Sequence, residues 1–247
     1  MPVRAASVPA VADRPDRALV DAVRAALHAV ADPVAAGPMQ AYMKSSMPFL
    51  GVPAPARSTA LRPVLAAHPL ADPATWRGTV GTLFRDAAYR EERYAALAIA
   101  RRYPAHLAAE PAPSLDLLDD IVVTGAWWDV VDEAAIRLLG PLLLGHPAAI
   151  RPAVQRWARD ADRWRRRAAV ICQIAAKERT DTALLAEVIE ANVADQDFFL
   201  RKGIGWALRQ HARLDRDWVR RFVATHELSP LSRREAVKHL RSSPPTS

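Results

Sequence analysis

The chain of 247 residues is 51% hydrophobic and 25% charged, which is the composition of an ordinary soluble globular protein. No apolar run approaches the roughly 20 residues that a membrane-spanning helix requires, and the first residues lack the apolar core of a signal peptide. We therefore expect a cytoplasmic protein without a membrane partner. The single cysteine, Cys172, excludes an internal disulfide, and its apolar setting AAVICQIAA predicts a buried thiol.

Positive charge gathers in the C-terminal part of the chain. Residues 1–150 hold 14 Lys/Arg and 15 Asp/Glu, whereas residues 151–247 hold 20 against 12, so the net charge of +7 arises in the latter. The stretch RPAVQRWARDADRWRRR, residues 151–167, contains seven arginines and two aspartates. Such a local field favours a polyanion, most commonly nucleic acid, although a solvated arginine-rich surface explains the charge equally well.

Apolar residues recur at spacings of three and four along nearly the entire chain, and alternating β-branched runs are absent, so the pattern predicts an all-α fold. Breaks between helices fall at proline and glycine signals such as ADP, GVPAP, EPAPS and GHP. We interpret residues 1–14 and 242–247 as a disordered lead-in and tail of a single domain that spans 15–241. The predicted helices are 15–31, 38–47, 55–67, 73–86, 90–103, 114–124, 127–144, 148–158, 162–177, 181–193, 197–212, 215–225 and 230–241.

Helix pairs recur in the second half of the chain with a period near 35 to 40 residues, which is typical of helical repeat proteins. Asp132, Arg167 and Trp206 are separated by 35 and 39 residues, about one repeat each. In a stack of repeats they would occupy equivalent helices and line one concave surface. A carboxylate, a guanidinium and an indole on a basic face indicate a site in preference to core packing.

The stretch GAWWDVVDEA, residues 125–134, places two tryptophans beside two aspartates in a chain with only 6% aromatic residues. In a helix, Trp128 and Asp132 are four residues apart and project from the same face. Trp127 then points elsewhere, most simply into the core. The segment therefore predicts a surface on which an indole and a carboxylate stand together.

Five segments of the chain carry a family resemblance: PMQAYMKSSMPFLGV, GAWWDVVD, WRRRAA, DFFLRKGIGWALRQHAR and ELSPLSRREAVKHL. The motifs WWDxVD, FFxxKxIGWxLR and LSRREAxKH within them are specific. In this order, over about residues 18–241, they resemble the AlkD family of alkylpurine DNA glycosylases. The resemblance implies a right-handed superhelix of HEAT-like antiparallel helix pairs whose concave basic face holds duplex DNA. It also implies hydrolysis of the glycosidic bond of cationic N3- and N7-alkylpurines, without the base flipping that most glycosylases use.

The resemblance assigns roles to individual residues. Asp132 matches the family's catalytic aspartate, Trp128 and Trp206 match its DNA-facing tryptophans, and Arg167 matches its catalytic arginine. Tyr42 matches an aromatic residue that approaches DNA from the N-terminal repeats. Asp132 would stabilise the oxocarbenium-like sugar and position the attacking water, while the two indoles would hold the cationic sugar or base. Arg167 would hold a phosphate beside the lesion.

Further cations are candidate contacts to the DNA backbone. Lys202 and Arg209 lie on the helical face that carries the second DNA-facing tryptophan, although each can also be interpreted as a solvated charge. Arg233 and Arg234 either extend the DNA-binding face or pair with Glu235 and nearby acidic residues. The complete set of DNA-binding candidates is Tyr42, Arg165, Arg166, Lys202, Arg209, Arg233 and Arg234.

The seven histidines are dispersed without HxxxH or HxH spacing, so we expect no metal site and no cofactor. Two classes of function remain open. One is a monofunctional glycosylase that acts as a monomer on alkylated duplex DNA and initiates base-excision repair. The other is a non-catalytic scaffold that binds DNA of unusual shape. The complete set of four catalytic candidates favours the enzyme, because a scaffold would be expected to lose it.

Overall fold

The computed structural model describes residues 13–240, and every regular element within that range is helical, with no strand. This confirms the predicted all-α class. The disordered segments expected at 1–14 and 242–247 fall almost entirely outside the described residues. The chain divides into two compact units, Met1–Ala100 and Arg101–Ser247, which are described separately. The single domain expected over 15–241 and the handedness of its superhelix stay predictions.

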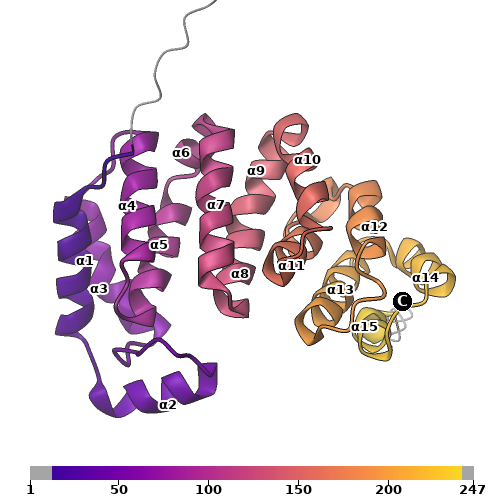
Figure 1. Ribbon diagram of the computed structural model, residues 1–247, viewed down its shortest axis with the longest axis horizontal. Helices are drawn as coiled ribbons and strands as arrows, with labels where there is room; N and C mark the ends of the chain where they lie inside the picture. Colours follow the sequence, from indigo (N-terminus) through magenta and orange to yellow (C-terminus); the bar gives the residue numbers. More distant parts are fainter. Residues whose placement is uncertain (1–12, 241–247) are drawn as a thin grey trace, which may run out of the picture. The chain divides into compact units, whose positions relative to one another are not determined.

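Within its described residues the first unit contains five helices, three of which are capped by aspartates, and a fourth carries Glu91 and Glu92 in its first turn. Its helices are α1 (Arg17–Ala29), α2 (Pro33–Met43), α3 (Ala54–Ala67), α4 (Pro73–Arg85) and the greater part of α5 (Arg90–Arg102). α1 packs against both α3 and α4 (Figure 1). Asp16, Asp32 and Asp72 precede α1, α2 and α4, and each accepts a hydrogen bond from a backbone N–H of the first turn.

The start of α2 differs from the prediction. The sequence predicts a helix from residue 38, whereas α2 begins at Pro33 and contains Pro38 in its interior. The dipeptide Asp32-Pro33 is a stronger signal for the start of a helix. Asp32 accepts a hydrogen bond from the N–H of Val34 at 2.9 Å, and Pro33 takes the first helical position, where no intrahelical partner for an N–H exists. α2 buries none of its residues, so the backbone bond lost at Pro38 is open to water.

The second unit is built from two rows of helices. Its elements are α6 (Pro104–Ala109), α7 (Pro111–Gly125), α8 (Trp128–Ala134), the π-helical turn η1 (Ala135–Leu139), α9 (Gly140–Gly145), α10 (Pro147–Trp157), α11 (Arg163–Ile171), the 3₁₀ turn η2 (Lys177–Arg179), α12 (Thr182–Glu190), α13 (Phe198–His211), α14 (Arg216–Thr225), α15 (Pro230–Ala236) and the 3₁₀ turn η3 (Val237–His239). One row runs α8, α11, α13, α15, each helix contacting the next, and the other contains α7, α10 and α12 (Figure 1). Successive members of a row come from successive helix pairs, as helical repeats predict.

Several elements of this unit differ from the predicted ones. The helix expected over 162–177 ends at Ile171, and the helix expected over 230–241 is α15 followed by η3. The short helix α6 is absent from the predicted set, and the helix expected over 127–144 is divided into α8, η1 and α9. Pro141 explains the division, because it has no N–H to continue the regular ladder and the preceding turn widens into a π-helix.

Apolar side chains from both rows form the core of the second unit. Ile121 of α7, Ile150 of α10 and Leu200 of α13 are fully buried. Cys172 at the end of α11 is buried as predicted, and desolvation raises the pKa of its thiol to about 12. The thiol is therefore protonated at neutral pH and contributes as an apolar core group.

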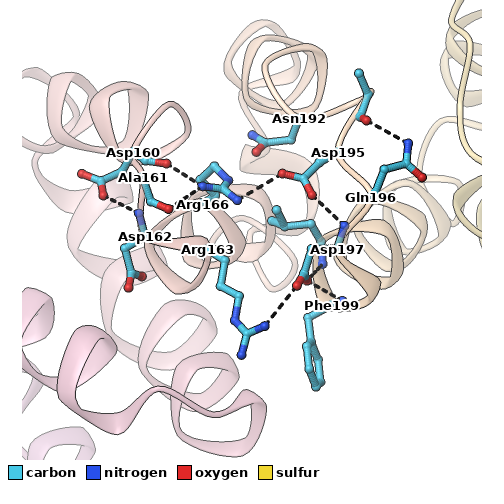
Figure 2. Close-up of polar contacts among 12 residues, drawn as sticks. Asp160, Ala161, Asp162, Arg163, Arg166, Asn192, Asp195, Gln196, Asp197 and Phe199 are labelled. Atoms are coloured by element: carbon cyan, nitrogen blue, oxygen red, sulfur yellow. Dashed lines mark hydrogen bonds and ion pairs between the residues drawn. The ribbon is translucent and has the colours of Figure 1, made fainter.

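A three-residue capping motif repeats before α11 and α13. In Asp160-Ala161-Asp162 and in Asp195-Gln196-Asp197, the first aspartate accepts a hydrogen bond from the backbone N–H of the second, at 2.8 and 2.7 Å. The second aspartate then caps the helix. Arg166 links the two motifs, because it donates to the carbonyl oxygen of Asp160 at 2.7 Å and pairs with Asp195 at 3.1 Å (Figure 2). The capping motif thus fixes one repeat onto the next.

Candidate functional site

A cleft of about 380 Å³ lies along the row α8, α11, α13 and α15 of the second unit. It brings together all four residues for which the sequence predicts a catalytic role, together with two of the predicted DNA-binding cations. Two phenylalanines and a glutamate complete its lining and are absent from the candidates. The lining residues are Trp128, Asp132, Arg167, Phe198, Phe199, Lys202, Trp206, Arg209 and Glu235.

Asp132 on α8 and Arg167 on α11 form a two-point ion pair in the cleft. Arg167 Nε donates to Oδ1 of Asp132 and Nη2 donates to Oδ2, each at 2.7 Å. Arg167 Nη1 donates to the carbonyl oxygen of Phe199 on α13. The Arg167 side chain is only 6% exposed and that of Asp132 is 15% exposed. Arg167 therefore orients the carboxylate, and little of its surface is left for the phosphate that the sequence assigned to it.

The surroundings of Asp132 disfavour its charge. Burial raises the pKa of this carboxyl above its usual range, and the hydrogen bonds and charge of Arg167 offset only part of that effect. The nearby charge of Asp129 acts in the same direction as burial. A carboxylate that is shielded from water interacts strongly with a positive charge placed beside it, because little solvent screens the pair.

Trp128 and Trp206 place two indoles in the lining. Trp128 is 36% exposed and lies one helical turn before Asp132, on the same face of α8, as predicted. Trp206 is partly buried and lies one turn after Lys202 on α13. Each indole thus adjoins a charged side chain, and the cleft presents flat π surface together with charge.

Trp127 precedes α8 and packs against other aromatic side chains. Its ring packs against Trp164 at 6.0 Å and against Phe199 at 5.4 Å between centroids, so it points inward as predicted. Trp127 lies 35 residues before the capping residue Asp162 and takes the equivalent N-cap position, without a side-chain cap. At this repeat an aromatic cluster replaces the capping carboxylate and fixes where α8 begins.

Two glycines of α13 allow its neighbours to approach closely. A Cβ on Gly203 would lie 3.2 Å from Nη1 of Arg167, and a Cβ on Gly205 would lie 2.5 Å from the Cβ of Glu235. The glycines are two residues apart and so face opposite sides of the helix. The sequence GIG therefore seats Arg167 from α11 on one side of α13 and Glu235 from α15 on the other.

Glu235 gathers three cations around one carboxylate. Lys202 lies 3.0 Å and Lys238 lies 2.9 Å from its oxygens, and Arg209 also donates to it. Burial opposes the charge of Glu235, whose side chain is 6% exposed, but the hydrogen bonds from Lys238 and Lys202 outweigh it and lower the pKa to about 2. Lys202 and Arg209 line the cleft as predicted, yet both are held by this carboxylate.

Comparison with known proteins identifies the family. A family model described as "DNA alkylation repair enzyme" matches residues 23–240. The chain belongs to the DNA alkylation repair enzyme family. A solved structure titled "Predicted DNA alkylation repair enzyme from Enterococcus faecalis" is similar, with 27% identity, a TM-score of 0.72, and coverage of 86% of this chain and 98% of that chain. No curated protein matches the chain. Membership assigns the chain to the repair of alkylated DNA and implies that it binds DNA.

In this DNA alkylation repair enzyme, two predicted DNA-binding arginines are engaged outside the cleft. Arg165 donates to both carboxylate oxygens of Asp119 at 2.6 and 2.7 Å, and its pKa is raised, chiefly by those hydrogen bonds. Arg166 links the capping motifs before α11 and α13 (Figure 2). Both arginines join repeats to one another, and a role toward DNA stays a prediction for each.

The remaining predicted arginines lie on α15. Arg233 and Arg234 are exposed, and Arg233 donates to the carbonyl oxygen of His226 at 3.3 Å. Among the described residues, Glu235 pairs with neither of them and instead turns toward Lys202 and its neighbours. Of the two interpretations that the sequence left open for these arginines, pairing with Glu235 is wrong.

Tyr42 belongs to the first unit. It lies on α2, is 80% exposed, and lines a separate cavity of about 480 Å³ with mostly apolar neighbours such as Met39, Phe49 and Tyr94. Its expected approach to DNA stays a prediction.

The described residues offer neither a cluster of metal ligands nor a membrane-spanning helix. Within residues 13–240 there is no group of three or more His, Cys, Asp or Glu side chains arranged to hold a metal ion. None of the helices in that range is long and apolar enough to cross a membrane.

Proposed function

We propose that this chain is a DNA glycosylase that hydrolyses the N-glycosidic bond of cationic N3- and N7-alkylated purines in duplex DNA. The observation that carries the proposal is the shielded carboxylate of Asp132, held at two points by Arg167 in a cleft that also presents two indoles. The resemblance to the AlkD family and the membership of a DNA alkylation repair family support it. The base is expected to stay within the duplex, since the family resemblance implies no flipping.

The chemistry of the substrate explains why a carboxylate suffices. An N3- or N7-alkylpurine is already positively charged, so it leaves as a neutral base when it takes the electron pair of the glycosidic bond. Positive charge then develops on the deoxyribose, and a fixed negative charge beside the sugar lowers the energy of that transition state. Water adds to the anomeric carbon and loses its proton to the Asp132 carboxylate or to solvent. No acid is needed to protonate the leaving base.

The neighbours of Asp132 have separate roles in this proposal. Trp128 and Trp206 hold the cationic sugar or base against their indole faces, each contact contributing on the order of 1 kcal/mol. Arg167 acts as a positioning residue, because its hydrogen bonds fix both oxygens of Asp132 and leave the carboxylate one preferred orientation. Bases that leave without a positive charge are not substrates, because the cleft offers no evident acid for them.

The test compares Asp132→Asn with a matched control. Asp119→Asn also weakens a two-point Asp–Arg pair of the second unit, but Asp119 lies outside the cleft lining. Free 7-methylguanine and 3-methyladenine released from methylated duplex DNA are measured by chromatography at matched salt. We expect release by the wild type and by Asp119→Asn, and a loss of at least about a hundredfold in Asp132→Asn with DNA binding retained.

The same experiment decides between the two classes of function. If wild type and variants bind DNA and none releases base, the chain is a DNA-binding scaffold and the glycosylase proposal is wrong. If Asp132→Asn keeps the wild-type rate, base release proceeds without that carboxylate and the assigned mechanism is wrong.

A further inference from the structure

The proposed chemistry does not use Glu235, although it is the second carboxylate of the cleft lining. Its side chain is as buried as that of Arg167, at 6% exposed, and it contacts three cations of α13 and η3. A buried carboxylate placed for stability alone needs one good partner, whereas this one neutralises only part of the charge around it. The surplus positive charge of the cluster remains available to an anion.

The charges in the cleft lining form two separate groups. Asp132 and Arg167 pair between α8 and α11, whereas Glu235 pairs with Lys202 and Arg209 between α15 and α13. The lining therefore holds three cations and two carboxylates. Without Glu235 the excess positive charge of the lining would double, from one to two. That excess would oppose any further cation that enters the cleft.

A substrate of this cleft makes two opposite electrostatic demands, if the proposed function holds. The DNA phosphates require positive charge, which favours binding. The alkylated base and the developing sugar cation require that positive charge be limited. A carboxylate that holds two lysines and an arginine at the edge of the cleft can satisfy both demands, because it fixes the cations in place and reduces their field toward the reacting group.

We propose that Glu235 sets the charge balance of the cleft: it holds Lys202 and Arg209 in place and neutralises part of their charge, which keeps the cleft tolerant of a positively charged base. Glu235 is thus a positioning residue that acts through the two cations, and its contribution is specific for cationic substrates. This inference rests on the proposed function. It makes Glu235 a determinant of the preference for positively charged substrates, separate from the reacting carboxylate of Asp132.

The expected signature is a split between binding and release. Glu235→Gln keeps the shape and the close contact with Gly205 but removes the charge. We expect it to bind undamaged duplex DNA more tightly. The slope of the logarithm of the binding constant against the logarithm of the salt concentration should steepen by about 0.9, the value for one added phosphate contact. Release of 7-methylguanine from the saturated complex should fall on the order of tenfold. A merely structural role would weaken binding and release together.

Two further variants keep the inference open to test if Glu235→Gln folds poorly. Glu235→Asp retains the charge on a shorter side chain and should stay close to the wild type in both measurements. Lys202→Gln removes a positive charge from a half-exposed residue, whereas Glu235→Gln removes a negative one. It should bind DNA more weakly, with a shallower salt slope, and should release base faster from the saturated complex, because the cleft then carries less positive charge.

The outcomes separate this inference from the proposed function. Tighter binding with slower release in Glu235→Gln, or weaker binding with faster release in Lys202→Gln, supports the inference. Two outcomes overturn the inference alone, provided that the wild type releases base. In one, Glu235→Gln matches the wild type in rate and salt slope; in the other, it is folded but loses both affinity and rate. The inference is equally overturned if Lys202→Gln leaves release from the saturated complex unchanged or lowers it. A wild type that releases no base overturns the proposed function and the inference together.

Discussion

Arg167 on α11 binds both carboxylate oxygens of Asp132 on α8, at 2.7 Å each, and these two residues hold equivalent positions in successive repeats. Each lies five residues after the N-cap of its helix, Trp127 for α8 and Asp162 for α11. Lys202 holds the same position in α13, five residues after Asp197. The repeat therefore supplies a row of matching positions, and the cleft arises because they carry side chains of different charge.

Breaking the pair from the arginine side should destabilise the protein strongly. Arg167→Met leaves the shielded Asp132 carboxylate without its partner and removes the hydrogen bond to the Phe199 carbonyl, so we expect a loss of about 3 kcal/mol in the free energy of unfolding. Arg165→Met is the matched control, since the Arg165–Asp119 pair has the same two-point geometry but is more exposed and should contribute about 1 kcal/mol. Denaturant unfolding measures both. Equal losses would contradict the assigned difference in burial.

Adding one methyl group to α13 should separate it from α15. In Gly205→Ala the new Cβ would meet Glu235 Cβ at 2.5 Å and the Ser232 carbonyl oxygen at 2.9 Å, so α15 must move away. The loss of packing should exceed the gain of about 1 kcal/mol that alanine gives in a helix, and the melting temperature should fall. Gly37→Ala in α2 meets nothing within 4 Å and should leave stability unchanged or raise it. A Gly205→Ala variant that melts at or above the wild-type temperature would rule out the close approach.

Much of the site could be read from the sequence because repeats translate spacing into position. The 35 residues between Asp132 and Arg167 place both on the cleft row, and the four residues between Trp128 and Asp132 place both on one face. Trp206 was expected on the same surface and does line the cleft, although it lies one turn beyond Lys202, the residue that occupies the equivalent position. Periodicity assigns each residue to a helix and to a face of that helix, and these two assignments are sufficient to predict which residues line the cleft.

The partners of charged residues could not be read in the same way. One of the two interpretations left open for Arg233 and Arg234 pairs them with Glu235, because a sequence shows which residues are neighbours along the chain and not which are neighbours in space. The true partners Lys202 and Arg209 lie on α13 and reach Glu235 because Gly205 lets α15 pack closely. The pairing of Arg167 with Asp132 also depends on tertiary packing, which a spacing does not reveal. The phosphate-binding role expected of Arg167 stays a prediction.

The two tryptophan positions of α8 and α11 should separate activity from stability. Trp128 is a partly exposed cleft residue, so Trp128→Ala should slow base release about fivefold, which corresponds to the loss of roughly 1 kcal/mol of contact to a cation. The melting temperature should stay nearly unchanged. Trp164 is buried in the aromatic cluster, so Trp164→Ala should lose about 3–5 kcal/mol of stability. Phe198→Ala, which removes an exposed aromatic ring from the same cleft, controls for lost apolar surface. If Phe198→Ala slows base release as much as Trp128→Ala does, the effect is one of lost apolar surface and the role assigned to the indole is wrong.

Acid should slow base release at a higher pH than an ordinary aspartate would. The working form of Asp132 in the proposed mechanism is the carboxylate, and burial raises its pKa above the ordinary value of 3.8. As the pH falls, the ionised fraction therefore starts to decline earlier than it does for an exposed aspartate, and the rate declines with it. Single-turnover release of 7-methylguanine, followed from about pH 8 to about pH 4.5, should show this loss on the acid side.

Two controls make the acid limb specific to Asp132. Spontaneous release from the same DNA without protein is subtracted, because acid speeds depurination by itself. Circular dichroism at each pH shows that the protein is still folded, and Glu235, with a pKa of about 2, stays ionised throughout this range, so the second carboxylate of the cleft does not contribute. A rate that stays constant down to about pH 4.5 in folded protein would mean that the carboxyl titrates as an exposed one, or that its charge is not required.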